Sequence, residues 1–100
     1  MTFANVGTLE TAPGRRDEVV AVLTRPNPEL RAAGCLSYEV GVDDGAPDKV
    51  FVIELWESER AHRASLELSS VRAAIAEARP LLSGRTGGER FTVVGSPLHD

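Results

Sequence analysis

The sequence is poor in the residues that bind metals or cross-link a chain. Cys35 is the only cysteine, which excludes a disulfide within the chain and any metal site built from several cysteines. The two histidines, His62 and His99, lie far apart in the sequence and do not have the spacing of a metal-ligand pair. We therefore expect no bound metal.

Aromatic residues are also scarce, and the net charge is negative. Aromatics make up 5% of the chain, too few for the stacking surfaces that bind single-stranded nucleic acid. The formal net charge is −4, whereas binding to phosphates needs clustered Lys and Arg. No apolar run approaches the ~20 residues that cross a membrane, and the first residues do not form a signal-peptide pattern. We expect a cytoplasmic protein that binds neither nucleic acid nor membranes.

What remains is the composition of one globular domain. The chain has 100 residues, of which 42% are hydrophobic and 26% charged. These proportions are ordinary for a folded domain. A chain of this length buries roughly two-thirds of the surface that it exposes when unfolded, which is enough for one modest core. We expect residues 1–100 to form a single domain.

Four segments are predicted to be strands, three from the order of side chains along them and the third in the sequence from its richness in Val, Ile and Phe. They are residues 2–11, 35–42, 49–57 and 89–95. Residues 43–48, between the second and third segments, are mostly turn formers. The pattern predicts that these two strands form an antiparallel hairpin.

The alternation also predicts which side chains share a face. In the first strand Asn5 and Gly7 fall on one face, and Gly7 indicates a bulge or a close approach of the backbone. In the second strand the alternation places Leu36, Tyr38 and Val40 together. Asn5 is an amide in an otherwise apolar segment, so it needs a hydrogen-bond partner or points into a pocket.

Helices are expected between the strands. Pro13 suits a first helical turn, with the cap at Thr11 or Ala12. A second short helical turn is expected over residues 29–33. Gly34 follows it as a suitable stop.

The second half of the chain has two more helix signals. Ser58 is a suitable N-cap for residues 59–66, and Ser69 or Ser70 can cap a further helix. Residues 83–88 contain three glycines. We expect them to form a flexible connection to the last strand.

The order of elements is β-α-β-β-α-β, the ferredoxin-like α+β arrangement. It predicts a four-stranded antiparallel sheet with helices on one face. Both faces of the third strand are apolar, so its helix-free side is expected to be covered. Packing of two sheets against each other would cover it, which predicts a homodimer with twofold symmetry.

Two stretches resemble a known family. Residues 33–40 read AGCLSYEV and residues 53–62 read IELWESERAH. The first is similar to the start of the second strand in antibiotic biosynthesis monooxygenase (ABM) domains, and the second to the third strand and following helix of that family. The resemblance implies a dimeric α/β barrel with a pocket between sheet and helices. Its best-understood members oxygenate quinols or anthrone-type polyketides without flavin, haem or metal.

The resemblance implies catalytic roles for three residues. His62 lies where relatives often have His or Tyr, and an unperturbed pKa near ~6.5 lets a histidine accept a phenol proton near neutral pH. Trp56 matches an aromatic of the anthrone-oxygenase pocket, where its indole N–H would meet a substrate oxygen. Asn5, which matches an Asn of the family's haem-degrading branch, is the alternative donor to that oxygen. The alternative for His62 and Trp56 is an ordinary packing role.

Three more residues are candidates for substrate binding. Glu54 interrupts an apolar strand, which indicates a pocket role or an ion pair. Tyr38 would place its hydroxyl at the pocket rim. Ser65 occupies a position where many quinol-oxidising relatives have a second histidine.

The chain departs from the family at several polar positions. Val52 replaces a polar amide of the anthrone branch, and Ala76 lies near the position of its Arg. The haem-degrading branch needs a Trp at the position of Ser65 and a His at that of Ile75, so haem degradation is not expected. These losses favour an alternative in which the protein is a non-catalytic, hydrophobic-ligand-binding or regulatory dimer of the same fold.

The leading hypothesis is a cofactor-independent monooxygenase whose partners are dioxygen and a small hydrophobic aromatic molecule. Dioxygen reacts slowly with closed-shell carbon because its ground state is a triplet. A phenolate or enolate overcomes this by giving up one electron first. The protein then needs an apolar cavity, a proton acceptor and a donor to the oxyanion.

Overall fold

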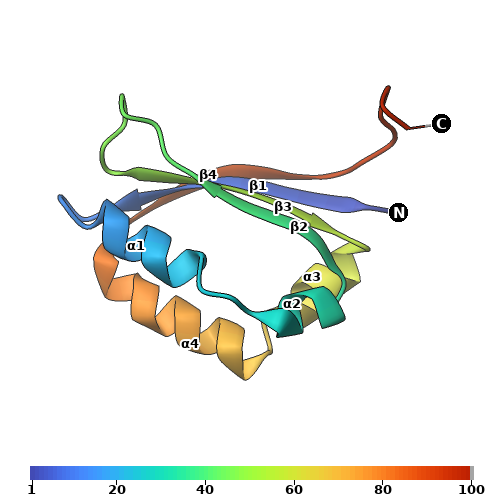
Figure 1. Ribbon diagram of the computed structural model, residues 1–100, viewed down its shortest axis with the longest axis horizontal. Helices are drawn as coiled ribbons and strands as arrows, with labels where there is room; N and C mark the ends of the chain where they lie inside the picture. Colours follow the sequence, from blue (N-terminus) through green and yellow to red (C-terminus); the bar gives the residue numbers. More distant parts are fainter. Residues whose placement is uncertain (100) are drawn as a thin grey trace.

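The computed structural model describes residues 1–99 and has two layers, a sheet and a set of helices (Figure 1). The strands are β1 (Phe3–Thr11), β2 (Cys35–Gly41), β3 (Lys49–Trp56) and β4 (Leu82–Thr92). The helices are α1 (Arg16–Leu23), α2 (Pro28–Ala32), α3 (Glu59–Ser65) and α4 (Ser69–Ala78), and a 3₁₀ turn, η1 (Arg79–Leu81), precedes β4.

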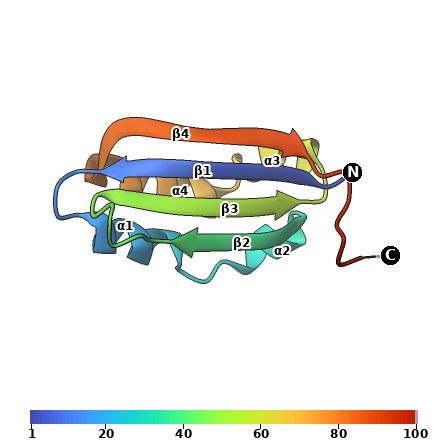
Figure 2. The same ribbon diagram turned by 90° about the horizontal axis from the view of Figure 1, so that it is seen from above.

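The sheet is antiparallel throughout, with the strand order β2-β3-β1-β4 (Figure 2). All four helices lie against one of its faces, as Figure 1 shows. This confirms the α+β, ferredoxin-like arrangement and the hairpin of β2 and β3. None of the helices within residues 1–99 is long and apolar enough to cross a membrane.

The expected connection over residues 83–88 is wrong, because these residues belong to β4. Gly87 pairs with Thr8 and Gly88 pairs with Gly7 of β1. Strand pairing uses backbone N–H and C=O groups, which glycine supplies like any other residue. The strand also ends earlier than expected, at Thr92, although the Val93 N–H still donates to the Thr2 carbonyl at 2.9 Å.

Two of the expected helix starts are also wrong. Arg15 is the N-cap of α1, so Pro13 lies before the helix, and Thr11 is the buried last residue of β1. Helix α4 begins after Leu68 and has no side-chain cap. The Ser58 cap is confirmed, since its side chain accepts a hydrogen bond from the Ala61 N–H at 3.0 Å.

A bulge in β2 overturns the expected position of Leu36. The register between β2 and β3 shifts between Cys35 and Ser37. Cys35 therefore joins Tyr38 on the helix side, where it is buried, and Leu36 is 50% exposed. The alternation in the sequence does not reveal the extra residue.

The core consists of two clusters of apolar side chains, and a polar residue separates them on β3. Val52 belongs to the cluster under α1 and α4, and Trp56 to the cluster near α2 and α3. Tyr38 packs against both clusters. Glu54 lies between them in sequence and on the same face of the strand. The core thus leaves one carboxylate on the helix side of the sheet.

Two glycines face each other across β1 and β4, which run side by side in Figure 2. Gly7 pairs with Gly88, and Gly88 has φ of +147°, a conformation that favours glycine. A Cβ at Gly88 would lie 2.3 Å from the Val6 carbonyl oxygen. The close approach expected at Gly7 is therefore present, and its narrowest point is at Gly88.

We predict that Gly88→Ala destabilises the protein by about 2 kcal/mol or more, because the new methyl group clashes with backbone and φ is strained. The control is Gly41→Ala, since a Cβ there meets nothing within 4 Å. Urea unfolding followed by Trp56 fluorescence measures both variants. Equal stability of the two would show that the backbone relaxes freely at Gly88.

Candidate active site

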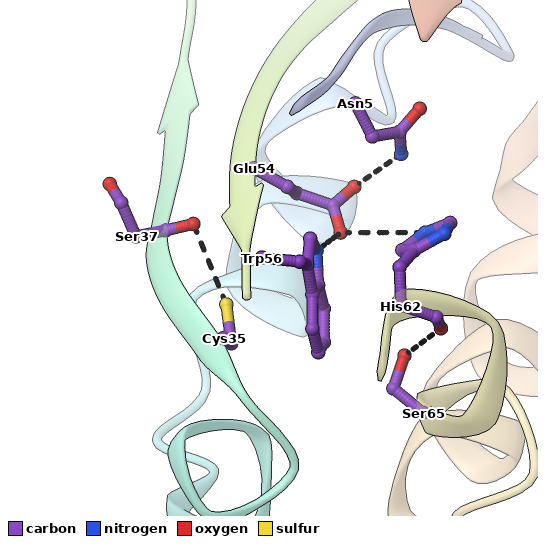
Figure 3. Close-up of polar contacts among 7 residues, drawn as sticks. All are labelled: Asn5, Cys35, Ser37, Glu54, Trp56, His62 and Ser65. Carbon is purple, nitrogen blue, oxygen red and sulfur yellow. Dashed lines mark hydrogen bonds and ion pairs between the residues drawn. The ribbon is translucent and has the colours of Figure 1, made fainter. Parts of the chain in front are cut away.

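Glu54 is the centre of a polar group on the helix side of the sheet (Figure 3). Its residue exposure is 9%, and both carboxylate oxygens accept hydrogen bonds. The Asn5 Nδ2 donates to Oε2 at 2.7 Å, and the Trp56 Nε1 donates to Oε1 at 3.1 Å. A carboxylate in this position needs such donors, because a buried charge without partners is strongly unfavourable.

The strand register places these donors. Asn5 lies directly opposite Glu54 in the antiparallel pairing of β1 and β3. Trp56 follows Glu54 by two residues, so both side chains stand on the same face of β3. The contact between residues 49 positions apart therefore follows from the pairing of two strands.

His62 lies beside this group on α3 and is 7% exposed. Its Nε2 is 3.9 Å from Glu54 Oε1, too far for a hydrogen bond. The rings of Phe3 and Trp56 flank the imidazole at centroid distances of 5.5 and 5.4 Å. The Ser65 hydroxyl donates to the His62 carbonyl oxygen at 2.6 Å, within the same helix.

The surroundings favour a neutral imidazole. Burial lowers the pKa of His62 below its usual 6.5; the Glu54 carboxylate opposes this shift and the Arg90 guanidinium adds to it. The imidazole is therefore mostly neutral at neutral pH and can accept a proton. A proton taken up there would be stabilised by the carboxylate beside it.

Tyr38 of β2 pairs with Glu54 of β3, and β2 borders β3 on the edge away from β1. Burial raises the pKa of its phenol, and the Glu54 carboxylate raises it further. The hydroxyl therefore stays protonated at any physiological pH. It remains available as a hydrogen-bond donor.

Cys35 contributes no chemistry of its own to this group. Burial raises the pKa of its thiol, and the Sγ donates to the Ser37 carbonyl oxygen at 3.5 Å (Figure 3). A buried thiol that stays protonated is a poor nucleophile.

A hollow of about 620 Å³ lies over this part of the sheet and is lined by residues of all four strands. Gly7 and Gly88 place no side chain in it. Apolar groups come from Leu9 and Val52. Its polar side chains on this face are Asn5, Tyr38, Glu54, Thr86 and Arg90. The volume lies in the range of small-molecule sites.

The structure divides the six residues expected at the site into two groups. Asn5, Tyr38 and Glu54 line the hollow. His62, Trp56 and Ser65 do not line it: Trp56 and His62 contact or approach Glu54, and Ser65 bonds to the backbone of His62. The Trp56 indole N–H is already bonded to Glu54.

Sequence reasoning missed Thr86 and Arg90. Thr86 lies in the segment expected to be a flexible connection. Arg90 was inside an expected strand, and the position of Phe91 on one face places Arg90 on the other. That alternation was the signal that could have found it. Within residues 1–99 no three His, Cys, Asp or Glu side chains come together as a metal site.

Comparison with known proteins shows to which family the chain is similar. The sequence model of the antibiotic biosynthesis monooxygenase family matches residues 2–77. The chain belongs to this family. The resemblance noted in the sequence is thereby confirmed, and ABM membership rests on most of the chain.

Solved structures give the same result. A Chloroflexus aurantiacus protein named "putative antibiotic biosynthesis monooxygenase" is 35% identical, with 96% of each chain covered and a TM-score of 0.84. A Caulobacter crescentus protein of the same name is 24% identical, covers 94% of this chain and 91% of its own, and has a TM-score of 0.78. The second shows the shared fold alone. No curated protein matches the chain.

We predict that Glu54→Gln lowers the pKa of His62 further, because the carboxylate is the largest contribution that favours the imidazolium. Glu59→Gln is the control, since Glu59 acts on His62 more weakly and its side chain is 60% exposed. NMR titration of the two imidazoles, His62 and His99, measures the shift. A pKa that rises in Glu54→Gln would contradict the arrangement described above.

Proposed function

We propose that this ABM protein is a cofactor-independent monooxygenase that acts on a quinol or on an anthrone-type polycyclic aromatic. The observation that carries the proposal is a hollow walled by the Glu54 carboxylate, with the neutral imidazole of His62 3.9 Å from that carboxylate. A flat aromatic fits such a space, and the two groups together can take a proton from it.

The reaction on an anthrone-type substrate balances with dioxygen alone. A ring CH₂ group loses one proton to the protein, and the resulting enolate passes one electron to dioxygen. The two radicals combine to a peroxide at that carbon. Loss of the second C–H hydrogen and cleavage of the O–O bond leave a C=O group and one water molecule, which carries both hydrogens after the protein returns the first.

Glu54 is the group that meets the substrate in this proposal, and His62 is the base behind it. Glu54 receives the proton at the hollow and shares it with Nε2 of His62. Asn5 and Trp56 hold the carboxylate in place, since their N–H groups already donate to it. Of the three expected site residues that line the hollow, Tyr38 has a protonated hydroxyl that can donate to the substrate oxyanion. Ser65 acts only through the backbone of His62.

Oxygen uptake with anthrone and with menadiol, combined with product analysis, tests the proposal. We expect His62→Ala and Glu54→Gln to lower kcat by about 10²–10⁴-fold, the usual contribution of a positioned acid or base. His99→Ala and Glu59→Gln are the matched controls and are expected to keep the wild-type rate.

Two results would contradict the proposed monooxygenase activity. One is wild-type uptake in both His62→Ala and Glu54→Gln. The other is tight binding of anthraquinone to the wild-type protein without any oxygen consumption, which would favour the non-catalytic ligand-binding dimer.

We also propose that the protein is a homodimer that packs through the helix-free face of the sheet. This face carries Ile53 and Phe91, which are 49% and 50% exposed. Ile53 lies on β3 and Phe91 on β4. The pairing of both strands with β1 places the two side chains on the same face of the sheet. Apolar groups on a strand face at this exposure favour association.

Ile53→Lys is expected to convert the dimer to a monomer, because each copy would then bury an unpaired ammonium group in the interface. Ile75→Lys is the control, a change of the same kind at 42% exposure on α4, on the other side of the molecule. Size-exclusion chromatography with light scattering measures the mass. A wild-type monomer, or a dimer that Ile53→Lys leaves intact, would overturn this interface.

A further inference from the structure

Among the residues that the structure describes, Arg90 is the only cation that lines the hollow. It lies opposite Asn5 on β4, and Glu54 lies opposite Asn5 on β3. Neighbouring strands are about 4.8 Å apart. The backbones of Arg90 and Glu54 are thus two strand spacings apart, with the Asn5 amide between them and the two opposite charges on either side.

Arg90 has no ion-pair partner within residues 1–99. The five ion pairs of this part of the chain involve other cations. Its neighbour Glu89 points to the other face, as the alternation of the strand requires. Asn5 directs its N–H toward Glu54. Arg90 is exposed, and its guanidinium forms no ion pair with Glu54 or Glu89, which also line the hollow.

The adjacent backbone leaves space for an anion beside it. Gly88 comes two residues before Arg90 on the same face of β4, and Gly7 faces it from β1. Neither residue places a side chain between the guanidinium and the rest of the hollow. A planar group placed over these glycines would lie between the strands that carry Glu54 and Arg90.

We propose that Arg90 is a substrate-positioning residue that pairs with an anionic oxygen at the end of the aromatic ring system away from Glu54. A negative oxygen next to the Glu54 carboxylate would be repelled, and the guanidinium attracts it at the opposite end. The substrate is thereby oriented, with its acidic hydrogen toward Glu54. The inference uses the proposed function for the identity of the ring system.

The anionic oxygen can have two sources. A carboxylate substituent carries the charge before any reaction. The carbonyl oxygen of an anthrone-type substrate acquires it when the ring carbon across from it loses its proton. Pairing of Arg90 with a carboxylate substituent would strengthen binding, and pairing with the carbonyl oxygen would speed deprotonation. Measurements of affinity and of kcat therefore distinguish the two sources.

The binding experiment needs no turnover. Anthraquinone-2-carboxylate and the neutral 2-(hydroxymethyl)anthraquinone are titrated calorimetrically into wild type, Arg90→Gln, Arg90→Lys and Arg85→Gln. We expect the wild type to bind the carboxylate roughly tenfold or more tightly than the neutral probe, the scale of a charged hydrogen bond. Arg90→Gln removes this preference, Arg90→Lys restores part of it, and Arg85→Gln, on the same strand outside the hollow, keeps it.

Oxygen uptake with anthrone supplies the second arm. Equal binding of the two probes together with a lower kcat and an unchanged KM in Arg90→Gln assigns the charge to the reacting oxygen. Unchanged probe affinities and unchanged kcat in Arg90→Gln overturn the proposal. An Arg90-dependent preference for the carboxylate in a wild-type protein that consumes no oxygen rejects the monooxygenase and leaves this site in place.

Discussion

The feature on which the site depends is the carboxylate of Glu54 on the covered side of the sheet. A buried carboxylate is tolerated only where donors and nearby polar groups replace water. Here these are the Asn5 amide and the Trp56 indole. These hydrogen bonds orient both side chains, and the Trp56 ring meets the His62 imidazole in a T-shaped arrangement. Glu54 thus joins side chains of β1 and β3 by hydrogen bonds and lies beside His62 of α3.

The hollow has a different physical origin, the absence of side chains. Gly7 and Gly88 are paired across two strands, and Gly88 tolerates no Cβ because the Val6 carbonyl lies too close. The tight backbone packing that excludes a larger residue also keeps the space above it empty. Polar groups of β1, β2, β3 and β4 surround that space because antiparallel register places Asn5, Tyr38, Glu54 and Arg90 in one row across the sheet.

Much of this was accessible from the sequence, and the remainder has definite causes. The order of elements and the cap at Ser58 follow from local patterns, and these were predicted correctly. The bulge at Leu36 was not, because one inserted residue leaves the local composition unchanged and reverses the faces before it. The glycines of β4 read as a loop because their pairing partner lies about 80 positions away in the chain. Residues 5, 54, 56 and 62 were each suspected, but their hydrogen bonds depend on a register that no single segment encodes.

The direction of those hydrogen bonds decides which chemistry the site can perform. The Trp56 and Asn5 donors point at Glu54, so they fix a proton acceptor and cannot also bind an oxyanion with the same hydrogens. Burial keeps His62 neutral while Glu54 opposes that shift, which makes the pair receptive to one proton. The groups that remain for stabilising negative charge are the protonated phenol of Tyr38 and the guanidinium of Arg90. The acceptor and these donors come from different strands, so a substrate that contacts all of them must span the sheet from β2 to β4.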